Sequence, residues 1–386
     1  MSRSYPLVLG AACLSYAALG AVLRILPTHV GDDLHGSAAA VGLAVGAPAL
    51  TAIAARPLGG RLGDRIGPRP VVIAGSVVMA AGVLPALRGG LPALDASRLV
   101  VGVGEGAMMA ATVLWLLRLA GPERRGRALG HIGLANYAGL ASGPLLADAL
   151  GGDPHRVFAA ALVLPLAGGA FVALLRPPPA PAPEPDGRGV RDRGPSLLRA
   201  TLRPGVGLAL VNVGYVALIA FGSAVGSDHG AGAASLVVPA FAVTVIAARL
   251  AGASIPDRLG AVPTLRACVF AEGLGLVALA VLHGSVLVLA AVVVLAAGQA
   301  LAVPALGLIA LAGVPAARHG AAAGLFFSWF DAGVGLGGPL VGAAARASTP
   351  PVAIVLAGVA VLCVVPVAAP PRIARPGARR AAVIRR

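Results

Sequence analysis

The sequence predicts an all-α membrane protein with twelve transmembrane helices arranged in two pseudo-symmetric six-helix halves. Three observations predict this fold: the composition, the spacing of the apolar runs, and an internal repeat. Of the 386 residues, 58% are hydrophobic and only 12% are charged, whereas about 25% charge is typical of a soluble domain. The chain therefore has too little polar surface to face water on every side.

Apolar runs, separated by segments that contain arginine, give the twelve candidate spans. Glycine and proline within the runs are compatible with a membrane helix. Each run is close to the length that crosses the hydrocarbon core of a bilayer. The first run is taken as an uncleaved span, because many further hydrophobic runs follow it. The expected spans are 6–26, 37–58, 70–88, 97–117, 127–149, 156–175, 202–224, 233–253, 264–283, 286–311, 320–343 and 350–369.

The arginines favour one orientation in the membrane. All 30 basic residues are arginine, and 25 of them, Arg56 and Arg249 included, fall on the inner side when the N-terminus is placed inside. This excess predicts a multi-pass protein of the plasma (cell inner) membrane with both termini in the cytoplasm. The arginines that fall outside or near the outer ends are Arg24, Arg88, Arg98, Arg156 and Arg346.

Two halves of the chain repeat each other. The sequence Thr51–Arg56 recurs as Thr244–Arg249 at an offset of 193, and Asp64-Arg65 recurs as Asp257-Arg258 at the same offset. Later matches drift to larger offsets, as expected of diverged repeats. A Pro-rich charged stretch between the halves indicates a linker. The expected organisation is an N-terminal six-helix bundle at 1–176, a cytoplasmic linker at 177–200, a C-terminal six-helix bundle at 201–370, and a basic cytoplasmic tail at 371–386.

The segment between the second and third spans carries the most specific motif. Its glycines allow the backbone to turn sharply. Its aspartate can accept hydrogen bonds from the N-terminus of a neighbouring helix, where the helix dipole favours an anion. Its arginines can pair with carboxylates or hold the loop at the inner interface. The residues concerned are Gly60, Asp64, Arg65, Gly67 and Arg69.

This segment resembles the loop signature G-x-L-x-D-R-x-G-R-R of the major facilitator superfamily, from which Pro68 departs. The resemblance implies a transporter in which the loop latches the two halves together at the cytoplasmic side. The repeat copy of the motif, Asp257 and Arg258, is degenerate. The alternative interpretation is an ordinary Gly/Asp turn with arginines on the inner side.

Few ionisable residues lie inside the spans, and those few are candidates for proton coupling. Arg98 opens a segment that resembles the family's R-x-x-x-G-x-G pattern, whose arginine is linked to proton transfer. Interfacial snorkelling of Arg98 is the alternative. Buried carboxyl groups are costly in the charged form and are functional by default, which adds Glu105 and Asp331 as candidates. Glu105 lies two turns from Arg98 on roughly the same face, and a structural role is expected for Glu272.

A third segment, in the fifth span, contains Gly139, Gly143 and Pro144. It resembles the G-x-x-x-G-P-x-x-G-G signature that is found mostly in proton-coupled exporters. Here the ending is Ala147-Asp148, where the signature has two glycines. Small residues four positions apart also let helices pack closely, so generic helix packing is the alternative.

Polar and aromatic residues inside the spans are candidates for lining a substrate cavity. Asn136 and Gln299 occupy the repeat positions of Asp331 and Glu105, respectively. Packing is the alternative role for the aromatic residues. The six candidates are Asn136, Tyr137, Asn212, Tyr215, Gln299 and Trp329.

The resemblance implies a secondary transporter that works by alternating access. The first hypothesis is proton-coupled efflux of a small amphipathic compound. The alternatives are uptake or facilitated passage of a small polar solute, and a non-transporting membrane scaffold or receptor. The expected partners are a small-molecule substrate, protons and the lipid bilayer, with the protein as a monomer.

Several other classes are excluded. The chain lacks the lysine that a Walker P-loop needs, and it has no H-E-x-x-H or paired-cysteine metal motif. We therefore expect no enzyme activity, no cofactor and no metal. Although the net charge is +15, the arginines alternate with apolar runs and form no basic face for nucleic acid.

Overall fold

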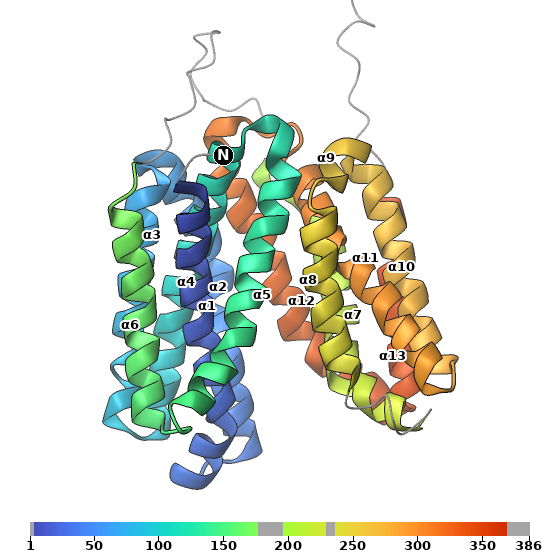
Figure 1. Ribbon diagram of the computed structural model, residues 1–386, viewed down its shortest axis with the longest axis horizontal. Helices are drawn as coiled ribbons and strands as arrows, with labels where there is room; N and C mark the ends of the chain where they lie inside the picture. Colours follow the sequence, from blue (N-terminus) through green and yellow to red (C-terminus); the bar gives the residue numbers. More distant parts are fainter. Residues whose placement is uncertain (1–3, 177–195, 229–235, 369–386) are drawn as a thin grey trace, which may run out of the picture.

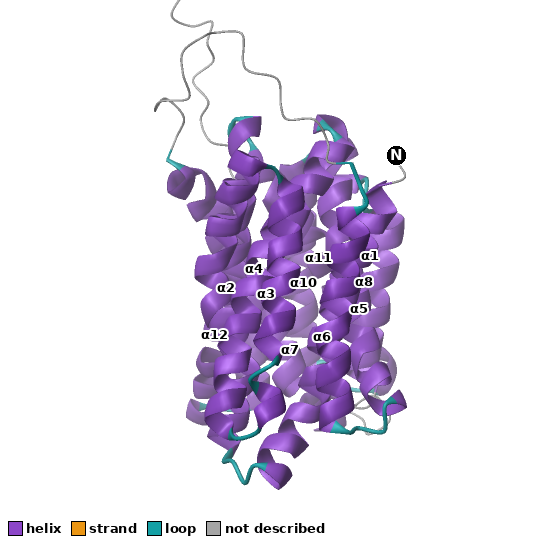
Figure 2. Ribbon diagram, turned by 90° about the vertical axis from the view of Figure 1, so that its left-hand side faces the viewer, coloured by secondary structure: helices purple, strands orange, loops and turns teal. Residues whose placement is uncertain are grey.

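The computed structural model describes residues 4–176, 196–228 and 236–368, and these fold entirely into helices and short connections. Figure 2 shows the long helices running side by side along one direction. The N-terminal helices are α1 (Ser4–Thr28), α2 (Ala38–Ile66), α3 (Pro68–Val83), α4 (Leu91–Ala120), α5 (Arg125–Ala149) and α6 (Pro154–Ala173). The C-terminal helices are α7 (Leu197–Asp228), α8 (Val237–Gly252), α9 (Ile255–Leu259), α10 (Ala261–Val281), α11 (Ser285–Leu311), α12 (His319–Ala347) and α13 (Pro350–Leu362). Short helical turns connect them: η1 (His29–Asp33), η2 (Ala86–Arg88), η3 (Pro122–Arg124), η5 (Ala316–Arg318) and η6 (Val365–Ala368).

The helices form two groups that follow the order of the sequence. Helices α1 to α6 pack on one another on one side of the molecule, and α7 to α13 on the other (Figure 1). Helices α2 and α12 make the main contact between the halves, and α5 meets α8 and α11. Helix α7 begins at Leu197, so the end of the expected linker at 177–200 belongs to this helix. The rest of that linker up to residue 195, and the expected tail at 371–386, lie outside the described residues.

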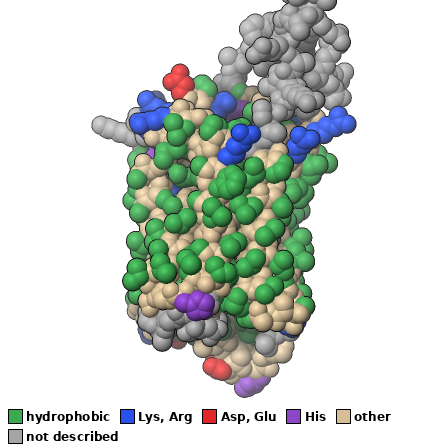
Figure 3. Space-filling view, turned by 90° about the vertical axis from the view of Figure 1, so that its right-hand side faces the viewer, with side chains coloured by type: hydrophobic (Ala, Val, Ile, Leu, Met, Phe, Trp, Pro, Cys, Tyr) green, Lys and Arg blue, Asp and Glu red, His purple; other side chains and the backbone are tan. Residues whose placement is uncertain are grey.

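The surface of the described residues matches a protein in a bilayer. Large apolar side chains cover the flank in Figure 3, and arginines gather toward one end. Within the described residues, eight helices are long and apolar enough to span a membrane, and α8 and α13 are shorter apolar helices. Apart from the five-residue α9, the remaining helices are α5 and α12, which lie against the opposite half. The prediction of a twelve-helix membrane fold is confirmed.

Glycine ends the corresponding helices of the two repeats. Gly67, between α2 and α3, has a φ of 90°, and Gly260, between α9 and α10, has a φ of 91°. This left-handed region is accessible to glycine at little cost. The two turns lie at the same end of the bundle as the start of α1 (Figure 1). We call this the arginine-rich end, since it carries the exposed Arg61, Arg65 and Arg258.

One prediction about this end is wrong in detail, and two of its arginines are buried. The expected second span stops at residue 58, but α2 continues to Ile66, so Gly60, Asp64 and Arg65 are helical and only Gly67 forms the turn. Arg56 and Arg249, which the orientation count places on the inner side, are buried, at 5% and 2% exposed, respectively. Both side chains point into the contacts between helices, where they find partners. Arg56 meets carboxylates there, and Arg249 meets a carbonyl group and an aromatic ring.

Candidate functional site

A cluster of four side chains, three of them buried and Tyr16 partly buried, lies at the contact between the halves. Arg56 on α2 donates from Nη2 to both oxygens of Glu105 on α4, at 3.2 and 3.3 Å. The same nitrogen donates to Oδ1 of Asp331 on α12 at 3.0 Å, and Arg56 Nε lies 2.7 Å from Asp331 Oδ2. The hydroxyl group of Tyr16 on α1 donates to Glu105. We call Tyr16, Arg56, Glu105 and Asp331 the charge cluster.

The charge cluster joins the two halves and is unequal in charge. Glu105 belongs to the N-terminal half and Asp331 to the C-terminal half, so Arg56 bridges them. All three ionisable side chains are nearly inaccessible to solvent. Two carboxylates face one guanidinium group, which leaves one negative charge uncompensated when both are ionised. A proton on either carboxyl group would make the cluster neutral.

At the arginine-rich end, Asp64 of the N-terminal half contacts α12 of the C-terminal half. Its carboxylate accepts from the backbone N–H groups of Gly320 and Ala321, at 2.9 and 2.8 Å, at the N-terminus of α12. The first turn of a helix has free N–H groups and a positive dipole end, so a carboxylate is stabilised there. Arg118 Nη2 lies 4.0 Å from Asp64 Oδ1 and adds a positive charge. This is the helix N-terminus partner that the motif predicts for Asp64.

Asp257 makes the same contact in the repeat. Its carboxylate accepts from the N–H groups of Gly126 and Arg127, both at 2.8 Å, at the N-terminus of α5. The degenerate copy of the motif has therefore kept the residue that makes the contact. Of the arginines in the motif, Arg69 donates to the carbonyl group of Ala173 on α6, whereas Arg65 and Arg258 are exposed.

The backbones of α2 and α12 touch next to the Asp64 contact. A Cβ atom built on Gly60 would lie 2.0 Å from the carbonyl oxygen of Gly320, and one on Gly324 would lie 2.3 Å from that of Arg56. Only glycine permits this approach. Ser328 on α12 also donates to the carbonyl group of Ile53, at 2.8 Å. Within the described residues, the hydrogen bonds between the halves lie at the level of Ile53 or between Ile53 and the arginine-rich end. The two halves are therefore in contact at this end, and we call this arrangement the closed form.

A cavity of about 220 Å³ adjoins the charge cluster. Its polar lining consists of Tyr16, Arg56, Asn136, Tyr137, Tyr215 and Arg249, and the remainder is apolar and includes Phe327 and Phe330. Both halves contribute to it. Asn136, Tyr137 and Tyr215, three of the candidates for a substrate cavity, line this cavity between the halves.

The other three cavity candidates lie elsewhere. Trp329 packs on α7 at Gly205 and does not line the cavity. The side chain of Asn212 is buried and donates to the carbonyl group of Leu208 in its own helix. Gln299 is buried on α11, and both polar atoms of its side chain lack a hydrogen-bond partner among the described residues. Helix rotation, which the sequence does not reveal, decides which faces meet the cavity.

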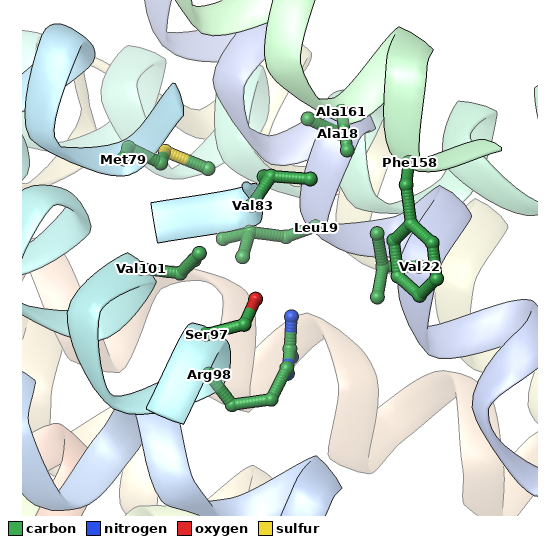
Figure 4. A pocket seen from close by; sticks show the side chains of 10 residues that line it. All are labelled: Ala18, Leu19, Val22, Met79, Val83, Ser97, Arg98, Val101, Phe158 and Ala161. Atoms are coloured by element: carbon green, nitrogen blue, oxygen red, sulfur yellow. The ribbon is translucent and has the colours of Figure 1, made fainter. Parts of the chain in front are cut away.

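Arg98 lies apart from the charge cluster. It is 3% exposed, so its guanidinium group does not reach the surface as snorkelling requires. Its Nε donates to the carbonyl group of Ala44 on α2, at 2.9 Å. Figure 4 shows it beside Ser97 at a small pocket within the N-terminal half, lined by Val22 and Phe158. Although Arg98 and Glu105 share a helix, Glu105 pairs with Arg56.

The glycines of the fifth span pack α5 against α1. A Cβ atom on Gly139 would lie 2.3 Å from the carbonyl oxygen of Cys13, and one on Gly143 would lie 2.4 Å from the backbone nitrogen of Ala21. Pro144 lies within the same helix. This geometry fits the packing alternative for the span 5 segment. Gly139, Gly143 and Pro144 are not part of the cavity lining.

Sequence reasoning missed Tyr16, Arg56 and Arg249 as site residues. The two arginines stand at matching positions of the repeat, each inside an expected span. An arginine within an apolar run is costly unless it is paired or solvated. The same arginine recurs at the same repeat position inside a span of each half. That recurrence was the signal that could have distinguished Arg56 and Arg249 from the arginines that indicate orientation. Glu272, by contrast, is buried in the C-terminal half with no partner for its carboxylate among the described residues.

The chain is similar to known membrane transporters. A profile of the Major Facilitator Superfamily matches residues 8–227. An uncharacterized MFS-type transporter of Burkholderia mallei (strain SAVP1) is 31% identical over 90% of this chain and 86% of its own length. One of Pseudomonas aeruginosa (strain LESB58) is 30% identical over 85% of this chain and 83% of its own length.

Solved structures share the fold at low sequence identity. The human organic anion transporter MFSD10 (TETRAN) superposes with a TM-score of 0.79 at 16% identity, covering 95% of this chain and 99% of its own. The E. coli fucose:proton symporter FucP gives a TM-score of 0.74 at 14% identity, covering 95% of this chain and 100% of its own. The proton:xylose symporter XylE also gives 0.74 at 14% identity, covering 95% of each chain.

Proposed function

Because this chain belongs to the Major Facilitator Superfamily, we propose that it is a secondary transporter that exports a small amphipathic compound in exchange for protons. The observation that carries the proposal is the buried charge cluster, in which Arg56 bridges Glu105 of one half and Asp331 of the other. A buried ionisable group at the junction of two moving halves can both bind a proton and control their movement.

Proton binding would act by weakening the link between the halves. With both carboxyl groups ionised, Arg56 holds α4 and α12 together and the arginine-rich end stays closed. Protonation of Asp331 removes its charge and the ion pair with Arg56, so less free energy holds that end shut. The halves then separate there, and the cavity faces the opposite compartment. Loss of the proton restores the ion pair and closes the end again.

The direction of transport follows from the orientation expected from the arginines. The proposal takes the arginine-rich end as cytoplasmic. Protons would then enter the closed form from outside and leave on the cytoplasmic side, and this inward movement drives export of a solute that is exchanged for the protons. The cavity fits an amphipathic compound, because aromatic and apolar side chains make up most of its lining.

Uptake of a small polar solute is the second candidate. FucP, a fucose:proton symporter, and XylE, a proton:xylose symporter, share the fold. A sugar presents many hydroxyl groups, and its buried hydroxyl groups need partners. The six polar side chains of the cavity include Arg56, which is already engaged with carboxylates. The cavity therefore favours an amphipathic compound over a sugar.

Everted membrane vesicles test the proposal. Respiration acidifies their interior, and a pH-sensitive dye reports the gradient while amphipathic compounds such as ethidium and 1-naphthoate are added. A compound that is exchanged for protons should partly discharge the gradient in vesicles with the wild-type protein. The Glu105→Gln and Asp331→Asn variants should not respond. If no compound discharges the gradient more than it does in vesicles that lack the protein, the antiport proposal is wrong.

A second reading separates loss of coupling from loss of the protein. The variants must be present in the membrane at the wild-type amount. The control variant is Asp153→Asn, since Asp153 caps α6 by accepting from the N–H group of Arg156 within one half. This variant loses a similar carboxylate contact but leaves the charge cluster and both contacts between the halves intact, so it should exchange protons at the wild-type rate.

A further inference from the structure

We propose that the substrate is an organic anion whose charged group binds Arg249 in the cavity, an inference that rests on the transport function proposed above. Arg249 lies on α8 and is 2% exposed. Its Nε donates to the carbonyl group of Ala300 on α11, at 3.2 Å. Its guanidinium carbon lies 4.7 Å from the centre of the Tyr137 ring, across the contact between the halves.

The charge of Arg249 is not neutralised by the protein. Among the described residues no carboxylate lies within ion-pair distance of it, and its Nη1 is buried without a hydrogen-bond partner. A buried charge without a counter-charge is strongly unfavourable. A cavity that presents such a cation is therefore suited to an anion that supplies the missing charge.

The repeat shows what is missing at this site. Arg56 and Arg249 are equivalent positions, and Arg56 is paired with Glu105 and Asp331. The position equivalent to Glu105 is Gln299, next to Ala300 on α11. The position equivalent to Asp331 is Asn136 on α5. Both carboxylates are thus replaced by neutral amides, and the C-terminal arginine has the surroundings of Arg56 without its counter-charges.

Other unsatisfied polar groups point to the same site. The hydroxyl group of Tyr137 and the amide oxygen of Asn136 are buried, line the cavity and have no hydrogen-bond partner among the described residues. A carboxylate or sulfonate could accept from Arg249 Nη1 and from the Tyr137 hydroxyl group. Arg56 does not compete for it, because that guanidinium group is engaged by two carboxylates.

The rest of the cavity fixes the class of anion. Its lining beyond the polar residues consists of apolar side chains, including Leu140, Phe327 and Phe330, and the aromatic ring of Tyr215 adds to this surface. Such a surface receives an aromatic or aliphatic body through burial of apolar area. A compound with one anionic group and an apolar body matches both parts. An organic cation would place its charge beside an unpaired arginine and would be repelled.

Binding of three probes of the same shape tests the inference. The purified protein is titrated with 1-naphthoate (anionic), 1-naphthamide (neutral) and 1-naphthylmethylamine (cationic), and affinity is read by calorimetry. The wild-type protein should bind 1-naphthoate most tightly. The Arg249→Gln variant should bind 1-naphthoate at least about tenfold more weakly, the typical size of a lost hydrogen bond to a charged group, with 1-naphthamide unchanged. Arg346→Gln, which removes an exposed arginine, is the control and should bind as the wild type does.

A second variant keeps the arginine and supplies the missing carboxylate. Gln299→Glu recreates in the C-terminal half the pair that Arg56 makes with Glu105, so it should retain the fold and lose 1-naphthoate binding by about tenfold or more. Wild-type affinity for 1-naphthoate in both Arg249→Gln and Gln299→Glu would overturn the inference. So would failure of 1-naphthoate to bind the wild-type protein, or tighter binding of the cation. The binding measurements do not depend on proton movement. If the protein binds 1-naphthoate as expected but exchanges no protons, the antiport proposal is refuted and the anion-binding proposal stands.

Discussion

Replacing Asp64 by asparagine should open the arginine-rich end. The carboxylate of Asp64 accepts from the N–H groups of Gly320 and Ala321 at the start of α12. An asparagine side chain has one accepting oxygen and no charge, so it can satisfy one N–H group and leaves the other buried without a partner. Hydrogen bonds to charged groups contribute about 1.5–3 kcal/mol each, and the charge at the helix N-terminus adds a smaller amount.

We therefore expect Asp64→Asn to weaken the closed form by about 2 kcal/mol, which changes the ratio of closed to open molecules roughly thirtyfold. Asp257→Asn removes the equivalent contact with α5 and should have a similar effect. The two contacts involve different helix pairs but oppose the same movement. Their free energies should add to about 4 kcal/mol in the double variant, or roughly a thousandfold.

Distances between two spin labels measure this equilibrium. Glu123, before α5, and Ala317, before α12, are exposed and belong to different halves at the arginine-rich end. The native cysteines Cys13, Cys268 and Cys363 are first replaced by alanine. The wild-type protein should give mainly the short distance, and the Asp64 and Asp257 variants a growing population at a longer one.

The Asp153→Asn control should match the wild-type distance distribution, because Asp153 caps α6 inside a single half. A double variant with the wild-type distribution would refute the reasoning. So would an equal shift in the Asp153 control, since the effect would then come from general loss of stability. Transport by Asp64→Asn should fall without loss of protein from the membrane.

Three further predictions concern the charge cluster and helix packing. Tyr16→Phe removes a hydrogen bond to Glu105 and should lower the free energy of unfolding by about 1 kcal/mol. The melting curve of the protein in detergent measures this, and a curve identical to that of the wild type would show that the hydrogen bond does not stabilise the protein. Gly139→Ala puts a Cβ atom 2.3 Å from the carbonyl oxygen of Cys13 and should lower the free energy of unfolding by about 1–3 kcal/mol. The control Gly335→Ala places its Cβ atom in open space and should melt as the wild type does. Asp331→Asn breaks the link to Arg56, so the labelled pair should show the long distance at every pH, and retention of the short distance would show that the link does not hold the end closed.

Much of the fold could be predicted because membrane insertion imposes simple rules on sequence. Apolar runs must be long enough to span the bilayer, and arginines favour the cytoplasmic side. The repeat and the helix-terminus role of Asp64 also followed from residue type and spacing. The twelve expected spans correspond to α1 to α8 and α10 to α13 of the described residues, with boundaries that move by several residues, as at α2.

The site was harder to predict, since it depends on which helix faces meet across the halves. Nothing in the sequence near Asp331 shows that it lies against Arg56, 275 positions earlier. Counting arginines for orientation also grouped Arg56 and Arg249 with the arginines of the inner side, although each lies within an apolar run. Trp329 was a reasonable cavity candidate by type, but its neighbour Phe330 lines the cavity and Trp329 contacts α7.

The most direct test of the proposed mechanism is the distance between the labels at Glu123 and Ala317 as the pH is lowered. Groups that face one another in the charge cluster come from four helices: Tyr16 on α1, Arg56 on α2, Glu105 on α4 and Asp331 on α12. If protons control the link, acidification should convert the short distance to the long one in the wild-type protein, and Asp331→Asn should remove this pH dependence. A wild-type distance that is the same in acidic and alkaline buffer would contradict the proposal that protonation of this cluster opens the arginine-rich end.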